Sequence, residues 1–285
     1  MPSRKAIKRR VASVTTTRQI VKAMDMVAGT KLQKVKKRLY AARPQATESR
    51  RMLDQLKRCE EASDHVFFQE REGKRVAYAV VSSDRGLCGG YNTNIGNAVL
   101  RHMEESGCAE QIFSIGLRGR EFFARRERNI VRWYQDVSDT VFYEDARMIA
   151  DTLIALFLAD EVDEVYVGYT HFETVLTHEP QVVRILPLGH RDVVPGDDDF
   201  DMKYEPDLKT VLDYAVPACL GGFLYSAMLE SAACEQASRM VSMEAATKNA
   251  TEIIDELSRM YNRKRQAYIT QEITEIIGGA EVSGQ

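Results

Sequence analysis

The stretch RRVASVTTTRQIVKAMDMVAGTKLQK, residues 9–34, lies in a longer segment where an apolar residue returns every seven positions. The row consists of Ile7, Val14, Val21, Ala28, Val35 and Ala42. A second row, four residues later, is apolar except at Arg18 and Asp25. This spacing, sustained over about six heptads, predicts one strand of a coiled coil. The predicted helix covers residues 1–58, and Pro44 is expected to kink it or end it.

The C-terminal third carries a second long helical pattern. From Leu229 to Tyr261, mostly apolar residues follow one another at alternating steps of four and three. Pro217 is expected to kink the lower part of this helix, and Gly278-Gly279 to stop it. The predicted C-terminal coiled-coil helix covers residues 207–285. Each of the two helices would be roughly 80 Å long at about 1.5 Å per residue.

Two long helices at opposite ends of a chain, each with one apolar seam, can cover their seams by pairing. We therefore expect an antiparallel coiled coil of the N- and C-terminal helices. The alternative, which the sequence leaves open, is two separate amphipathic helices packed on the middle of the chain.

The middle of the chain, residues 74–206, alternates strand and helix patterns. The β-branched apolar runs are Val76–Ser83, Ile112–Gly116, Glu164–Thr170 and Val182–Leu188. The helical segments between them are Asn94–Glu105, Arg118–Arg126 and Glu144–Ala159. This alternation predicts an inserted α/β domain, Rossmann-like, with a mostly parallel sheet. Residues Asp192–Asp201 read as an acidic surface loop.

Composition excludes several classes of protein. The apolar content of 44% is enough for a packed core. The longest apolar run, Leu153–Ala159, is far shorter than the roughly 20 residues of a membrane helix. No apolar segment follows the basic start, so no secretory signal is predicted. The five cysteines and five histidines are scattered, which predicts reduced thiols, no metal site and no cofactor.

Charge is distributed unevenly. Residues 1–60 contain 17 Lys and Arg against four acidic residues, a net of +13, and the remainder therefore carries −16. A basic segment of this kind favours an acidic partner. Nucleic acid is the other partner to weigh, but the segment has one aromatic residue for stacking, Tyr40, and the acidic remainder would repel a duplex. An acidic protein surface fits better.

The glycine-rich stretch SSDRGLCGGYN, Ser82–Asn92, follows a predicted strand and precedes a predicted helix. Loops at such a place often bind phosphate. This one has neither the G-x-x-x-x-G-K-[ST] nor the G-x-G-x-x-G spacing, so a structural turn is the favoured interpretation. Cys88 is interpreted as a buried thiol rather than a nucleophile, since no histidine or acid adjoins it in sequence. No catalytic residue is predicted.

Three segments together resemble one family. The first is the stretch quoted at the start, and the second is the turn VVSSDRGLCGGYN. The third is ASRMVSMEAATKNA, followed later by YNRKRQAYITQEITEIIGGAEV. In this order, and over the full length, they resemble the gamma subunit of F-type rotary ATP synthases.

The resemblance implies a non-catalytic rotor shaft that couples transmembrane proton flow through the c-ring to conformational change at the catalytic sites of the beta subunits. The implied partners are the alpha and beta subunits, the epsilon subunit and the membrane c-ring. It implies no binding of nucleic acid, and contact with the membrane only through the complex. With no transit peptide predicted, the expected location is the cytoplasmic face of a bacterial membrane.

The resemblance also implies particular contact residues. Met24 matches a methionine beside the acidic lever loop of the beta subunit, and Arg9, Arg10 and Arg85 match basic positions facing that loop. A hydrogen-bonding catch on the C-terminal helix is matched by Arg239, Gln266, Thr270 and Glu272. Tyr204 and Glu205 match the foot on the c-ring. A coiled-coil nucleic-acid-binding protein and a small α/β enzyme using Gly86–Gly90 remain the alternatives.

Overall fold

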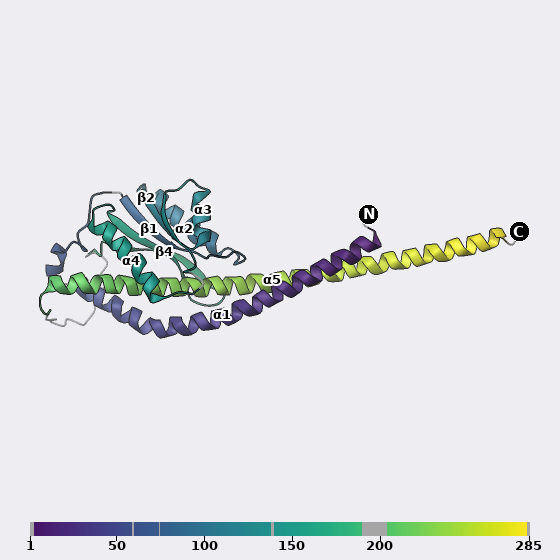
Figure 1. Ribbon diagram of the computed structural model, residues 1–285, viewed down its shortest axis with the longest axis horizontal. Coiled ribbons are helices and arrows are strands. Elements are labelled where there is room, and N and C mark those ends of the chain that lie inside the picture. The colour runs from purple at the N-terminus through teal and green to yellow at the C-terminus, as the bar shows by residue number, and fades with distance from the viewer. Residues whose placement is uncertain (1–2, 59, 74, 138–139, 190–203, 284–285) are drawn as a thin grey trace. The chain divides into compact units, whose positions relative to one another are not determined.

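The computed structural model describes residues 3–58, 60–73, 75–137, 140–189 and 204–283 (Figure 1). The acidic stretch Asp192–Asp201 lies outside these residues. The chain divides into two compact units, one formed by residues 29–239 and the other by residues 1–28 together with residues 240–285.

Helix α1 spans Arg4–Arg58. All thirteen positions of the two predicted rows between residues 7 and 53 are buried or half-buried, and Leu32 and Leu39 are almost wholly enclosed. The predicted seam is therefore confirmed. Pro44 lies within α1 without ending it. A proline removes one backbone hydrogen bond, which a long and well-packed helix can tolerate.

Helix α5 spans Leu208–Ser283 and includes Pro217. The prediction that Gly278-Gly279 stops the helix is wrong, because α5 continues through both glycines. Glycine permits a left-handed helix end but does not require one, and its place inside a helix costs only about 1 kcal/mol. One 18-residue window of α5 is apolar enough to span a membrane, with a mean hydropathy of 1.3, but half of that window is buried inside the protein.

Five strands form one sheet in the order β3-β2-β1-β4-β5. Their bounds are β1 Arg75–Val81, β2 Ala109–Ile115, β3 Ile130–Tyr134, β4 Glu164–Phe172 and β5 His178–Leu186. The first four strands are parallel, and β5 runs antiparallel to β4. The edge strand β3 was not predicted. It is short, three of its five residues are exposed, and Arg132 interrupts its apolar residues directly after a charged run.

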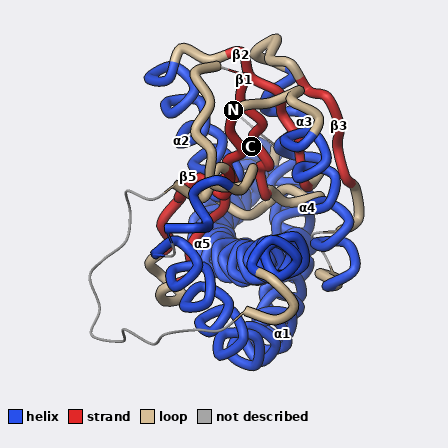
Figure 2. The backbone as a smooth tube through the Cα atoms, turned by 90° about the vertical axis from the view of Figure 1, so that its left-hand side faces the viewer, coloured by secondary structure: helices blue, strands red, loops and turns tan. Residues whose placement is uncertain are grey.

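Helices cover both faces of the sheet (Figures 1 and 2). Their bounds are α2 Tyr91–Ser106, α3 Leu117–Ala124 and α4 Tyr143–Leu158, with a short 3-10 turn, η1, at Glu60–Asp64. The side chains of Tyr78 and Val80 on β1 pack with Ile95 and Val99 of α2 and with Phe123 of α3. The other face is covered by α4 and by the early part of α5.

Within residues 29–239, α1 and α5 run antiparallel. The guanidinium Nη2 of Arg38 donates to the hydroxyl of Tyr225 at 3.3 Å. Ser49 comes after Arg38 on α1, and it hydrogen-bonds Cys219, which comes before Tyr225 on α5. Within the other unit, the guanidinium of Arg4 lies 5.2 Å from the centre of the Tyr268 ring. The predicted fold class is confirmed: an α/β fold with a Rossmann-like strand order and two long, paired terminal helices.

Candidate functional site

The strand order creates a topological switch point beside β1. From β1 the chain proceeds to β2 and β3 on one side, and it then returns to β4 on the other. In open α/β sheets, ligands bind outside the carboxyl ends of the strands at such a point. The turn between β1 and α2, residues 82–90, lies there. It is therefore the place to look for a binding site.

The turn occupies the donor groups at the start of α3. The backbone N–H of Leu117 donates to Asp84 Oδ1 at 3.0 Å, and that of Arg118 donates to the carbonyl of Ser83 at 2.9 Å. The N–H of Gly119 donates to Ser82 Oγ, also at 2.9 Å. A Cβ at position 119 would lie 2.6 Å from that hydroxyl, so glycine is needed here. The N-terminus of α3, which also opens beside the turn, is therefore satisfied by the chain itself.

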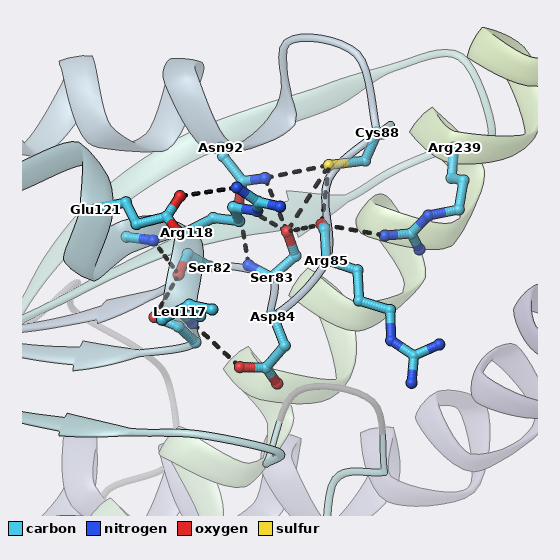
Figure 3. A network of polar contacts seen from close by, with 12 residues as sticks. Ser82, Ser83, Asp84, Arg85, Cys88, Asn92, Leu117, Arg118, Glu121 and Arg239 are labelled. Carbon is cyan, nitrogen blue, oxygen red and sulfur yellow. Dashed lines mark hydrogen bonds and ion pairs between the residues drawn. The ribbon is translucent and has the colours of Figure 1, made fainter.

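A second set of hydrogen bonds closes the turn (Figure 3). Ser83 donates its backbone N–H to Asn92 Oδ1 at 2.9 Å, and Asn92 Nδ2 donates to Cys88 Sγ at 3.1 Å. Burial raises the pKa of the Cys88 thiol, which disfavours the reactive thiolate. These contacts support the interpretation of the stretch as a structural turn with a buried thiol.

Helix α5 fills the crevice at the carboxyl ends of the strands. Ser231 Oγ accepts the backbone N–H of Thr170 at 3.0 Å, and Glu230 Oε2 accepts that of Phe172 at 3.2 Å. Tyr91, at the start of α2, is buried beside Ser231, and this burial raises its pKa well above the usual value. The space that a nucleotide would occupy in a related fold is taken by the protein's own helix.

Arg239 ties α5 to the turn. Its guanidinium Nη2 lies 2.7 Å from Glu235 Oε1, and it donates to the carbonyls of Arg85 and Gly86 at 3.3 Å each. Arg239 is 8% exposed and Glu235 is 2% exposed. A charge so well enclosed is held by paired hydrogen bonds rather than by water.

The tip of the turn is exposed. Figure 3 shows the side chain of Arg85 pointing away from the network while its carbonyl faces Arg239. Leu87 is 62% exposed and has a φ of 64°, a left-handed conformation that a leucine rarely adopts. The chain therefore holds one basic and one apolar side chain outward on a constrained loop.

The other predicted contact residues lie elsewhere. In the unit formed by the chain ends, Arg9 and Arg10 are exposed and Met24 is half-buried on α1. On α5 of the same unit the exposed residues are Gln266, Thr270 and Glu272. Just before α5 in the other unit, Tyr204 is half-buried and Glu205 is exposed.

Of the predicted contact residues, the structure brings together Arg85 and Arg239 in one network. Sequence reasoning missed Glu235, the partner of Arg239, and Asn92, which bonds Ser83 and Cys88 within the same turn. The i,i+4 spacing of Glu235 and Arg239 on a predicted helix was the one available signal. Among the described residues, no group of three or more His, Cys, Asp or Glu side chains could hold a metal ion.

Comparison with known proteins gives a consistent result. The profile of a family described as ATP synthase matches residues 3–282. The ATP synthase gamma chain of Alkaliphilus metalliredigens is 40% identical over 280 residues, which is 96% of each chain. That of Halothermothrix orenii is 38% identical and covers 99% of each chain. A sodium-ion-specific ATP synthase gamma chain of Acetobacterium woodii is 37% identical, over 96% of this chain and 97% of its own.

Solved structures agree with these relatives. A chain from the central stalk and c-ring of the Tetrahymena thermophila mitochondrial ATP synthase superposes with a TM-score of 0.62 and 26% identity, covering 80% of this chain and 99% of its own. A chain of the Euglena gracilis mitochondrial ATP synthase shares the fold, with a TM-score of 0.69 and 18% identity over 98% of this chain and 94% of its own.

Proposed function

This chain belongs to the family of ATP synthase gamma chains, and we propose that it is a shaft without catalytic activity of its own. In this proposal, proton flow turns the c-ring and the shaft with it. The shaft then presents different faces to the beta subunits and changes their catalytic sites in turn. This is coupling through differential contacts between states, and the shaft performs no chemistry.

The observation that carries the proposal is the far part of α5. Ile269, Ile273, Ile276 and Ile277 are 44–71% exposed along one stretch of helix. Apolar side chains gathered in this way favour a protein surface around them. Alpha and beta subunits that enclose this end of α5 with apolar side chains would supply that surface. The second supporting observation is the switch point of the sheet. There α5 packs at the carboxyl ends of the strands, where a nucleotide would bind.

The proposed contacts follow from exposure and charge. Arg9, Arg10 and Arg85 would face an acidic loop of the beta subunit, with Met24 beside it. Gln266, Thr270 and Glu272 would hydrogen-bond the ring, while Tyr204 and Glu205 would rest on the c-ring near the epsilon subunit. The chain would thus meet the cytoplasmic face of a bacterial membrane through the complex.

The isolated full-length chain is expected not to bind ATP at micromolar concentration. The amides at the start of α3 already donate to the turn, and α5 packs at the carboxyl end of β4. Isothermal titration calorimetry with Mg-ATP measures this directly. Micromolar binding that is abolished by Gly89→Val would overturn the proposal in favour of a small α/β enzyme.

Replacing Arg9, Arg10 and Arg85 together by Gln is expected to lower torque and coupling while the complex still assembles. Contacts between exposed charges are worth roughly 0–1 kcal/mol each and are screened by salt. The measurement is ATP-driven proton pumping and single-molecule torque in the assembled enzyme.

A matched control removes three other exposed charges, Arg125, Arg126 and Arg132, by the same change to Gln. If the control and the first triple variant lower coupling equally, net charge is responsible and the assignment of these contacts is wrong.

A further inference from the structure

We propose that Arg239 is a positioning residue: held by Glu235, it fixes the exposed tip of the turn, Arg85 to Leu87, for a partner and does not itself touch that partner. The inference rests on the proposed function for its consequence in the complex. The contacts from which it is argued all lie within this chain. It assigns to Arg239 a role different from the direct ring contact that the family resemblance implied.

The burial of Arg239 is the first step. A residue that contacts another subunit directly offers its donors outward, but Nη2 of Arg239 binds a carboxylate and two carbonyls of its own chain. Glu235 lies one helical turn earlier and is more deeply buried still. The two side chains are buried together, and the carboxylate orients the guanidinium toward the turn.

The choice of acceptors is the second step. Arg239 binds the carbonyls of Arg85 and Gly86, which belong to the part of the turn that lies at the surface. The same Arg85 carbonyl also accepts the hydroxyl of Ser83 at 2.7 Å. Two donors on this carbonyl, one from Ser83 and one from Arg239, fix the direction in which the Arg85 side chain leaves the turn.

The strained backbone is the third step. Leu87 follows the clamped carbonyls directly and has a positive φ, although it is not glycine. Such a conformation persists only where the surroundings hold it, and it tends to occur at functional sites. The hydrogen bonds of Arg239 to the carbonyls of Arg85 and Gly86, and those of Asn92 to Ser83 and Cys88, supply that constraint.

Cys88 provides a reporter within the full-length chain. Cys88 is 2% exposed and belongs to the turn, so a loosened tip would expose its thiol to maleimide. Arg239→Gln and Arg239→Lys are expected to raise the labelling rate of Cys88 on the order of tenfold, as loss of a hydrogen bond to a charged group would. Lysine keeps the charge but ends one bond short of the position of Nη2.

Two controls accompany this measurement, which is read by peptide-resolved mass spectrometry. Arg147→Gln breaks another i,i+4 ion pair, with Asp151 on α4, and is expected to leave Cys88 unchanged. Cys219, buried on α5 beside Ser49, reports general loosening. An unchanged Cys88 rate in both Arg239 variants overturns the proposal. So does a rise at Cys88 and Cys219 together, which would mean that Arg239 only stabilises the fold.

The assembled enzyme separates positioning from contact. If Arg239 acts through the tip, adding Arg239→Gln to Arg85→Gln lowers proton pumping per ATP no further than Arg85→Gln alone. Independent, additive losses would show that Arg239 meets the partner itself and would overturn the inference.

A failed contact assignment for Arg85 has a different signature. In that case Arg85→Gln leaves pumping unchanged while the Cys88 labelling result stands. If Arg239→Gln then lowers pumping, the inference fails as well.

Discussion

Met24→Lys is expected to give a complex that assembles and hydrolyses ATP but pumps few protons for each ATP. Met24 is half-buried on α1, and a flexible thioether can slide past a moving surface without holding it. A lysine would form a charge-assisted hydrogen bond with an acidic loop at some rotary angles and not at others. Such a bond, worth about 1.5–3 kcal/mol, would slow departure from that angle roughly tenfold to a hundredfold.

The measurement is proton pumping per ATP hydrolysed in inverted vesicles, with Met26→Lys as the matched control. Met26 is 67% exposed and lies two residues further along α1, so the control adds the same charge without the same placement. A second change that neutralises the acidic partner should restore Met24→Lys. An unchanged pumping ratio in Met24→Lys would remove this residue from the shaft contact.

Leu39→Ala is expected to lower the free energy of unfolding of the isolated chain by about 3 kcal/mol, the usual range for a leucine removed from a packed interior being roughly 2–5 kcal/mol. Leu39 is 0% exposed in the seam of α1. Urea unfolding followed by circular dichroism measures the change. Lys37→Ala, on the exposed side of the same helical turn, should shift the midpoint little. Equal effects of the two changes would mean that the seam adds no stability.

The terminal helices were predictable because burial there follows a period that can be counted. Each heptad places one side chain of each row toward the partner helix, so the sequence contains the seam directly. The ends of the helices were less predictable. Gly278-Gly279 has the local chemistry of a helix stop, yet nothing forces a glycine to leave the helix, and α5 continues.

The sheet was predictable where strands are buried on both faces, as β1 is. Strand β3 was not predicted because it is only five residues long and the exposed Arg132 divides its apolar residues. Its pairing with β2 arises from backbone hydrogen bonds, which leave no trace in the order of side chains.

The candidate site was predictable only in part. The position of the turn after a strand followed from the pattern, and so did the absence of a phosphate-binding spacing. The burial of Arg239 did not, since its acceptor at Arg85 lies 154 residues earlier in the chain. A contact across such a separation depends on the whole topology, and local spacing cannot reveal it.

The filled crevice at the ends of β1 and β4 also constrains the order of events during synthesis. The strands and the turn leave the ribosome well before the segment of α5 around Ser231, which completes their hydrogen bonding. Helix α1 emerges earlier still, and its apolar seam stays uncovered until α5 has been made. At about 5–20 residues per second, this interval lasts roughly ten seconds or more. The newborn chain therefore carries uncovered apolar surface until its last quarter is translated, and during that interval it is a natural client for chaperones.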